Sequence, residues 1–161
     1  MNLHLLLIRH AKAEPHSTSG RDFDRALSRK GQHQAEALNT WLLRRLQDEK
    51  ASAWSARYSP ALRTRQTARA ALHGLDEIDY QADERIWNAD ATALTAVFKD
   101  CAREKFGIIL VGHNPGMEQL LRQFTGQLRP VATGSVSEIA FADNFKQGRL
   151  VTQFRAEIDS V

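Results

Sequence analysis

Two histidines and two arginines stand near the ends of apolar segments or at the start of a helical segment. Arg9 and His10 directly follow one apolar run, His113 closely follows another, and Arg63 comes just after a serine–proline pair that is typical of a helix start. Arginine offers a planar, permanently charged fork to phosphate oxygens. A neutral imidazole can attack phosphorus and form a covalent intermediate. If the fold brings these four side chains together, they are suited to bind and transfer a phosphoryl group.

Each of these residues also has an ordinary structural interpretation. A single histidine at a strand end is more often a hydrogen-bonding residue than a nucleophile. Arg63 lies close to Arg65 and Arg69, and this spacing by itself favours an exposed basic helix face. Only the combined pattern points to phosphoryl chemistry. Four other histidines are interpreted as structural or surface residues: His4, His16, His33 and His73.

The apolar pattern predicts the strands that position these residues. Residues 3–8 form a near-continuous apolar run, which is typical of a buried parallel strand. Similar strands are expected over residues 53–58 and 107–111. Two more, over residues 135–141 and 150–158, are expected around a turn near residues 144–148.

Helix starts are predicted from residues that cap or open helices. Ser28 is expected to cap a first helix, and Ser59 a second one with Pro60 at its first helical position. Asp90 is expected to cap a third helix, and the Asn114–Pro115 pair to open a fourth. Apolar residues at helical spacing support the first, third and fourth helices: Ala35, Leu38, Leu42, Leu46, Leu94, Val97, Phe98, Cys101, Met117, Leu120, Leu121 and Phe124.

Alternating strands and helices predict the fold class. We expect an α/β fold with a mainly parallel central sheet and helices on both faces. Residues 11–25 are polar and are interpreted as a loop. The length of 161 residues, without repeats or linkers, predicts one domain over residues 1–161. In such sheets ligands bind beyond the carboxyl ends of the strands, where Arg9, His10 and His113 are expected.

Composition excludes several classes of protein. The hydrophobic share of 42% and the charged share of 25% are typical of soluble globular proteins. The first apolar run is too short for a membrane span or a signal peptide. Cys101 is the only cysteine, so an intramolecular disulfide and a thiolate metal site are excluded, and a cytoplasmic location is expected. The net charge is only +3 and the basic clusters lack interleaved aromatics, so neither nucleic acid nor a membrane is the expected partner.

Three segments resemble the motifs of a known superfamily. Residues 7–11, Leu-Ile-Arg-His-Ala, resemble the first motif of the histidine phosphatase superfamily, which has the phosphoglycerate-mutase-like fold. Ala11 replaces the glycine of that motif. Residues 59–68 and 111–115 resemble the second and third motifs, which supply a second phosphate arginine and a second histidine. The short chain and residues 9–13 and 24–31 are most similar to the SixA-type phosphohistidine phosphatases.

This resemblance implies roles for particular residues. His10 would be the nucleophile, Arg9, Arg63 and His113 would bind the phosphoryl group, and Arg25 would approach the same pocket. No metal and no organic cofactor is implied. The partner would be a phosphorylated substrate, with a phosphohistidine protein as the expected kind.

Three alternatives stay open beside this function. The chain could be a small-molecule phosphomonoesterase or a mutase of the same superfamily, although a mutase needs a closing lid for which this chain has little room. It could also be a non-catalytic module that binds phosphoproteins through the same arginines.

A general acid is missing from the sequence pattern. Many members of the superfamily carry a carboxylic acid after the second motif, and it protonates the leaving oxygen. Asp83, Glu84 and Asp90 occupy this region, but Asp90 is better explained as a helix cap and Glu84 as an exposed residue. We therefore assign no acid. A positioned acid is worth about 10²–10⁴-fold, so its absence favours phosphohistidine, with its labile P–N bond, or another activated phosphate over a sugar phosphate.

Overall fold

The computed structural model describes residues 2–103, 105–142 and 145–158. Its centre is a six-stranded sheet in the order β3-β2-β4-β1-β5-β6. The strands from β3 to β1 in this order are parallel, whereas β5 is antiparallel to both β1 and β6. The strands are β1 (Leu3–Arg9), β2 (Trp54–Tyr58), β3 (Asp79–Ala82), β4 (Gly107–Gly112), β5 (Ser135–Phe141) and β6 (Arg149–Arg155).

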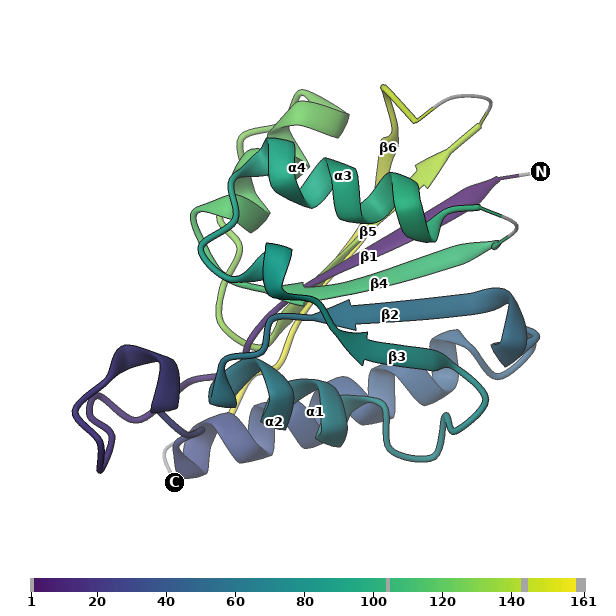
Figure 1. The fold of residues 1–161 in the computed structure, drawn as a ribbon. Coiled ribbons are helices and arrows are strands. Elements are labelled where there is room, and N and C mark those ends of the chain that lie inside the picture. The colour runs from purple at the N-terminus through teal and green to yellow at the C-terminus, as the bar shows by residue number, and fades with distance from the viewer. Residues whose placement is uncertain (1, 104, 143–144, 159–161) are drawn as a thin grey trace.

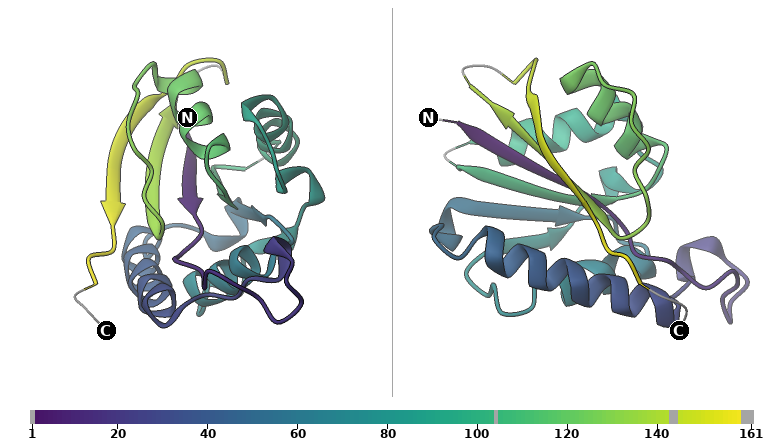
Figure 2. Two further views of the ribbon diagram at one scale, coloured as in Figure 1. Left: turned by 90° about the vertical axis from the view of Figure 1, so that its left-hand side faces the viewer. Right: turned by 180° about the vertical axis from the view of Figure 1, so that it is seen from behind.

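Helices cover both faces of this sheet. Figure 1 shows α1 and α2 on one face and α3 and α4 on the other, and Figure 2 shows the same layers from two further sides. The predicted α/β class is confirmed, with a mixed sheet whose larger part is parallel. The helices are α1 (Arg29–Arg45), α2 (Leu62–Ala71), α3 (Ala91–Cys101) and α4 (Gly116–Thr125), with short 3₁₀ helices η1 (Asp22–Asp24), η2 (Ala51–Ala53) and η3 (Glu84–Ile86).

Strand β1 lies between two hydrophobic cores. Successive side chains of a strand point to opposite faces of its sheet. Leu5 and Leu7 therefore join the core beneath α3 and α4, while Leu6 and Ile8 join the core beneath α1 and α2. All four side chains are fully buried, which explains why the sequence of β1 is apolar without alternation. The strand that leads to His10 is thus held firmly on both faces.

Two predicted helix caps are confirmed. The Ser28 hydroxyl oxygen accepts a hydrogen bond from the Gly31 N–H at 3.1 Å, at the start of α1. The Asp90 carboxylate accepts one from the Ala93 N–H at 2.9 Å, at the start of α3. Each bond satisfies a backbone donor that has no partner within its helix.

The predicted start of the second helix is wrong. Helix α2 begins at Leu62, with Ala61 as the residue before it, and no side chain caps it. Ser59 still belongs to the extended chain that continues β2, because its N–H donates to the carbonyl of Val111 in β4 at 3.1 Å. Pro60 therefore precedes the helix instead of opening it. Helix α4 similarly begins at Gly116, just after the Asn114–Pro115 pair.

Strand β3 and the ends of β6 also differ from the sequence pattern. Strand β3 was not predicted, because its four residues are all exposed and show no apolar alternation. Strand β6 ends at Arg155, earlier than the predicted end at Ile158. The first residue of the predicted turn, Asn144, lies outside the described residues. In the described part of the chain, no helix combines the length and apolar character needed to cross a membrane.

Candidate active site

The carboxyl ends of three parallel strands bring the predicted residues to one edge of the sheet. In β1 and β4, Arg9 pairs with Gly112, so His10 and His113 follow at the same level. Their rings have centroids 5.2 Å apart and planes inclined by 57°. Strand β2 ends at the same edge and leads through Ser59 to α2, which carries Arg63.

The main chain at His10 is fixed from three directions. Its N–H donates to the carbonyl of Gly112 at 3.0 Å, and its own carbonyl accepts from the N–H of Gly134 at 3.0 Å. The next N–H, that of Ala11, donates to the Thr67 hydroxyl oxygen of α2 at 3.0 Å. Strand β4, the segment before β5 and helix α2 therefore jointly position this histidine.

The imidazole of His10 has a defined tautomer. Its Nδ1 lies 2.7 Å from the carbonyl oxygen of Ala11. A carbonyl oxygen only accepts hydrogen bonds, so Nδ1 carries the proton and the lone pair of the neutral ring is on Nε2. Burial lowers the pKa of His10 to about 4, assisted by the charges of Arg63 and Arg9 and opposed by the Ala11 hydrogen bond. The ring is thus neutral, with Nε2 able to act as a nucleophile.

His113 is held by a serine and a tryptophan. Its Nε2 forms a hydrogen bond with the Ser59 hydroxyl at 2.8 Å, and its ring meets the indole of Trp87 edge-on, with centroids 5.2 Å apart. Burial is the largest cause that lowers the pKa of His113 to about 3, followed by the neighbouring His10 and Arg63. Both imidazoles at this edge are therefore uncharged at neutral pH.

Arg63 is buried, so its interpretation as part of an exposed basic face is wrong. Only 5% of the residue is exposed, because α2 directs it inward and its guanidinium is enclosed by Asp22 and Trp87. One terminal nitrogen donates to the Asp22 carbonyl at 2.8 Å and the other to the Asp22 carboxylate at 3.0 Å. The positive charge of Arg63 thus lies at the sheet edge.

Arg9 and Arg25 differ from Arg63 and from each other in their hydrogen-bond partners. The Arg9 guanidinium donates to the carbonyl of Val131 at 2.9 Å, and its charge lowers the pKa of both histidines. The Arg25 guanidinium donates to the Asp22 carboxylate at 2.8 Å and to the Glu14 carbonyl at 2.9 Å. Arg25 is therefore connected to Arg63 through Asp22, at the margin of the site.

The predicted group of four side chains is thus assembled at one sheet edge, and we call Arg9, His10, Arg63 and His113 the four-residue cluster. It combines two guanidiniums with two neutral imidazoles, a set that attracts an oxyanion. Within the described residues, Nε of both arginines and Nδ1 of His113 are buried without a hydrogen-bond partner. Buried polar atoms without partners are costly, so a ligand that bonded to those of the cluster would be favoured. In the described part of the chain, Trp54 Nε1 and Asn114 Oδ1 are also buried without a partner.

The carboxylates near the cluster are not placed as a general acid. Asp22 lies at the cluster, but although burial raises its pKa, the hydrogen bonds from Arg25 and Arg63 lower it below the ordinary value. Asp83 binds the backbone and guanidinium of Arg85, Asp90 caps α3, and Glu84 is exposed. No general acid is therefore assigned from the geometry either. Among the described residues, no group of three or more His, Cys, Asp and Glu side chains is arranged to hold a metal ion.

Three residues at this edge were not predicted from the sequence. Ser59 was interpreted as a helix cap but bonds to His113, Asp22 holds Arg63, and Trp87 contacts both His113 and Arg63. The serine–proline pair marked the position of Ser59 without showing its partner. Asp22 and Trp87 carry no comparable signal, because they lie in irregular segments.

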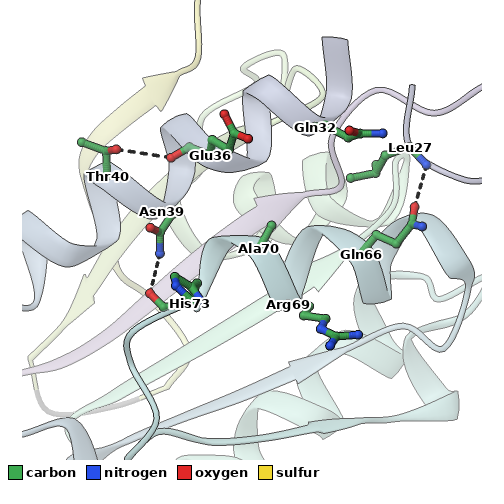
Figure 3. A pocket seen from close by; sticks show the side chains of 9 residues that line it. All are labelled: Leu27, Gln32, Glu36, Asn39, Thr40, Gln66, Arg69, Ala70 and His73. Atoms are coloured by element: carbon green, nitrogen blue, oxygen red, sulfur yellow. Dashed lines mark hydrogen bonds between the residues drawn. The ribbon is translucent and has the colours of Figure 1, made fainter. Parts of the chain in front are cut away.

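A hollow lined by residues of α1 and α2 lies away from the cluster. It has a volume of about 720 Å³ and runs between α1 and α2, as Figure 3 shows. Its polar side chains are partly used in holding the two helices and the preceding loop, since Asn39 donates to the His73 carbonyl and Gln66 accepts from the Leu27 N–H. None of the four cluster residues lines it. The chemistry of the side chains, and not the size of a hollow, identifies the candidate active site.

A family model matches more than half of the chain, including the first two motifs. The model describes the histidine phosphatase superfamily (branch 1) and matches residues 5–106. No curated protein matches the chain significantly.

Several solved structures share the fold over nearly the whole chain. Two proteins carry the provisional name phosphohistidine phosphatase SixA. The one from Nakamurella multipartitia has a TM-score of 0.82 at 19% identity, covering 96% of each chain. The one from Agrobacterium tumefaciens has a TM-score of 0.80 at 25% identity, covering 96% of this chain and 98% of that one. A phosphoglycerate mutase from Bacillus anthracis has a TM-score of 0.70 at 14% identity, covering 92% and 91%. The expected phosphoglycerate-mutase-like fold and the resemblance to SixA-type proteins are confirmed.

Proposed function

The chain belongs to the histidine phosphatase superfamily, and from this membership we propose that it is a phosphatase that forms a phosphohistidine intermediate on His10. The observation that carries the proposal is the state of the His10 ring. The ring is buried and neutral, its proton is held at Nδ1 by the Ala11 carbonyl, and its Nε2 lone pair is free to attack. Arg9 and Arg63 supply positive charge beside it.

In the proposed first step, the Nε2 lone pair of His10 forms a bond to phosphorus. The bond from phosphorus to the leaving atom breaks, and its electron pair goes to that atom, which takes a proton from water. Arg9, Arg63 and His113 bind the phosphoryl oxygens, so that positioning and electrostatics supply most of the rate. The imidazole becomes positively charged, and the hydrogen bond from Nδ1–H to the Ala11 carbonyl stabilises this charge.

In the proposed second step, water attacks the phosphorus of the phosphorylated His10. The P–N bond breaks and its electron pair returns to Nε2. The proton of the attacking water goes to solvent, inorganic phosphate leaves, and the neutral imidazole is restored. No metal or organic cofactor is needed in this proposal.

We propose phosphohistidine on a protein as the substrate. Two observations support this choice. No carboxylate is assigned as a general acid, because Asp22 at the cluster is paired with Arg63 and Arg25. The fold is also similar to that of two proteins with the provisional name phosphohistidine phosphatase. The imidazole of a phosphohistidine leaves without a dedicated acid more easily than an alkoxide does. We propose the cytoplasm as its location, on the basis of the composition discussed above.

Replacing the nucleophile tests the reaction type. We expect His10→Ala to lose nearly all turnover and to retain the wild-type thermal midpoint, because the ring contributes little to either core. The wild type should release a burst of product from a chromogenic phosphate and retain an acid-labile phosphoryl label, whereas the variant should show neither. His73→Ala, which removes an exposed imidazole, is the matched control. More than a few per cent of residual turnover in His10→Ala would contradict the assignment, and a wild type that binds phosphate without turnover would be a binding module.

Leaving groups of graded basicity test the substrate class. Without an acid, the leaving group carries its own developing charge, so the rate should fall steeply as its basicity rises. We expect phosphohistidine peptides and aryl phosphates to be cleaved roughly 10²-fold or more faster than phosphoserine peptides or sugar phosphates. Steady-state rates should be compared under conditions where hydrolysis of the intermediate is not limiting. A flat dependence would reveal a working acid, and Glu84→Gln would be the first variant to examine.

A further inference from the structure

An indole ring lies against the four-residue cluster on a segment outside all three motifs. The ring of Trp87 meets that of His113 edge-on, with centroids 5.2 Å apart and planes at 78°. The Arg63 guanidinium lies over the same indole, with Cζ 5.5 Å from the ring centroid. Trp87 therefore touches two of the residues that we propose bind the phosphoryl group.

Phe23 extends this aromatic surface. Its ring meets the Trp87 indole edge-on, with centroids 5.1 Å apart and planes at 88°. Phe23 lies in η1 beside Asp22, whose carboxylate binds Arg63. Both rings are half-buried, so part of each is open to solvent. We call Phe23 and Trp87 the aromatic pair.

Trp87 is held in place by its own segment. Ile86, directly before it, is buried in the core beneath α3 and α4, and the Trp87 N–H donates to the Glu84 carbonyl at 3.1 Å. Asn88, directly after it, has φ of 56°, in the left-handed region that asparagine tolerates better than most residues. The indole is therefore supported by a fixed turn and presented to the cluster by the scaffold.

His113 lies between the aromatic pair and the proposed nucleophile. Its ring contacts His10 and also contacts Trp87, each with centroids 5.2 Å apart. In an in-line displacement, the leaving group departs on the side of phosphorus opposite to the attacking atom. The leaving group of a phosphoryl group attacked by His10 therefore lies on the far side of phosphorus from His10, and Trp87 of the aromatic pair contacts the two phosphate-binding residues His113 and Arg63.

We propose that Phe23 and Trp87 bind the leaving group and select substrates in which it is a planar ring, such as imidazole. This inference rests on the proposed function and names the residues that would give it specificity. An imidazole or phenyl ring can pack on the aromatic pair in the edge-on or offset geometries that aromatic rings prefer. A leaving group without a ring gains none of this contact. One such contact is worth a factor of roughly 3- to 10-fold.

Two small substrates isolate the leaving group. Phosphoimidazole and phosphoramidate transfer the same phosphoryl group and break the same type of P–N bond, but only the first releases a ring. We expect Trp87→Leu to lower kcat/KM for phosphoimidazole roughly 3- to 10-fold more than for phosphoramidate. Trp87→Phe should retain most of the preference, because it keeps an aromatic face. Phe23→Leu should also lower kcat/KM for phosphoimidazole more than for phosphoramidate.

Matched controls separate specificity from a structural role. Trp41→Leu removes an indole of α1 that stacks on Phe154 instead of the cluster, and it should leave the preference unchanged. Free imidazole should inhibit the wild type more strongly than Trp87→Leu. Equal losses for both substrates in Trp87→Leu and Phe23→Leu would overturn the inference, because Trp87 would then only support Arg63 and His113. If Trp87→Leu does not fold, Phe23→Leu at the half-buried position in η1 decides. A wild type that hydrolyses neither substrate would contradict the proposed function itself.

Discussion

At the scale of single residues, the state of His10 follows from its main-chain surroundings. A histidine in water has a pKa near 6.5 and is partly protonated around neutral pH. In this fold the Ala11 carbonyl fixes the proton on Nδ1, and the end of β1 places the ring among Arg9, Arg63 and His113. The same environment that would bind an oxyanion thus also keeps the nucleophile unprotonated.

This environment predicts the titration of His10. Burial and the charges of Arg63 and Arg9 disfavour the protonated ring, so we expect a midpoint near pH 4 in the free protein, well below 6.5. The ring resonances should be followed by NMR from pH 7 to pH 3 in a buffer free of sulfate and phosphate, because a bound anion would favour the protonated form. His10→Ala assigns the resonance. A midpoint near 6.5 would show that the ring is not buried beside these guanidiniums in solution.

The sequence predicted which residues form the cluster but not what holds them. The types and spacing of Arg9, His10 and His113 were sufficient, because parallel strands end at one edge of a sheet. The partners of Arg63 were not predictable, since Asp22 and Trp87 reach it from irregular segments far along the chain. The spacing of the arginines in α2 even favoured an exposed face for Arg63, which is buried.

At the scale of elements, helix α1 packs directly on the chain that follows His10. A Cβ built at Gly31 would lie 1.9 Å from the Lys12 carbonyl oxygen, a separation that real Cβ atoms do not show. The same carbonyl accepts a hydrogen bond from the Ser28 N–H at 2.9 Å, and the Lys12 N–H donates to the Gln34 side chain at 2.8 Å. The absence of a side chain at Gly31 therefore lets α1 fix the start of the active-site loop.

Replacing Gly31 by alanine should therefore destabilise the protein. In an unobstructed helix this change stabilises by about 1 kcal/mol, because alanine has the better helix propensity. Here the methyl group must displace a backbone carbonyl, so we expect a net loss of about 1–3 kcal/mol in the free energy of unfolding, measured with urea. Lys30→Ala, at the exposed neighbouring position, controls for changes in helix propensity. Greater stability of Gly31→Ala would mean that α1 and Lys12 are not in close contact.

Elements with a strong local signal were predicted and those without one were not. The Ser28 and Asp90 caps mark their helices because each cap acts within one turn of the chain. Strand β3 has no such signal, since its residues are all exposed and it is a strand only because its backbone pairs with β2. The start of α2 was misplaced because a bond to Val111, in another strand, keeps Ser59 extended.

At the scale of the whole molecule, a buried carboxylate supplements the β1–β5 ladder that joins the antiparallel part of the sheet to the rest. Glu138 of β5 is only 2% exposed. It accepts hydrogen bonds from Nδ1 of His4 in β1 at 2.9 Å, and from two nitrogens of Arg45 in α1 at 2.7 Å and 2.9 Å. The sequence predicted a strand here but not its neighbours, because strand order depends on contacts between distant segments. A carboxylate in the sheet interior therefore links three elements.

This carboxylate predicts a pH-dependent stability. Burial alone would raise the pKa of Glu138, but the hydrogen bonds from His4 and Arg45 lower it from 4.5 to about 2. Its contribution is thus fully present above pH 4.5 and is lost as the pH falls toward 2, by about 3 kcal/mol in total. We expect Glu138→Gln to be clearly less stable than the wild type at pH 7, and the difference to shrink steadily between pH 4.5 and pH 2 in urea unfolding. His10 and His113, whose pKa values burial lowers, also weaken folding in acid, but they are common to both proteins and cancel in the difference. Glu49→Gln removes the exposed second partner of Arg45 and should lower the stability at pH 7 far less, because exposed ion pairs contribute little. A constant difference for Glu138→Gln across this pH range would show that its carboxylate is not stabilised by these bonds.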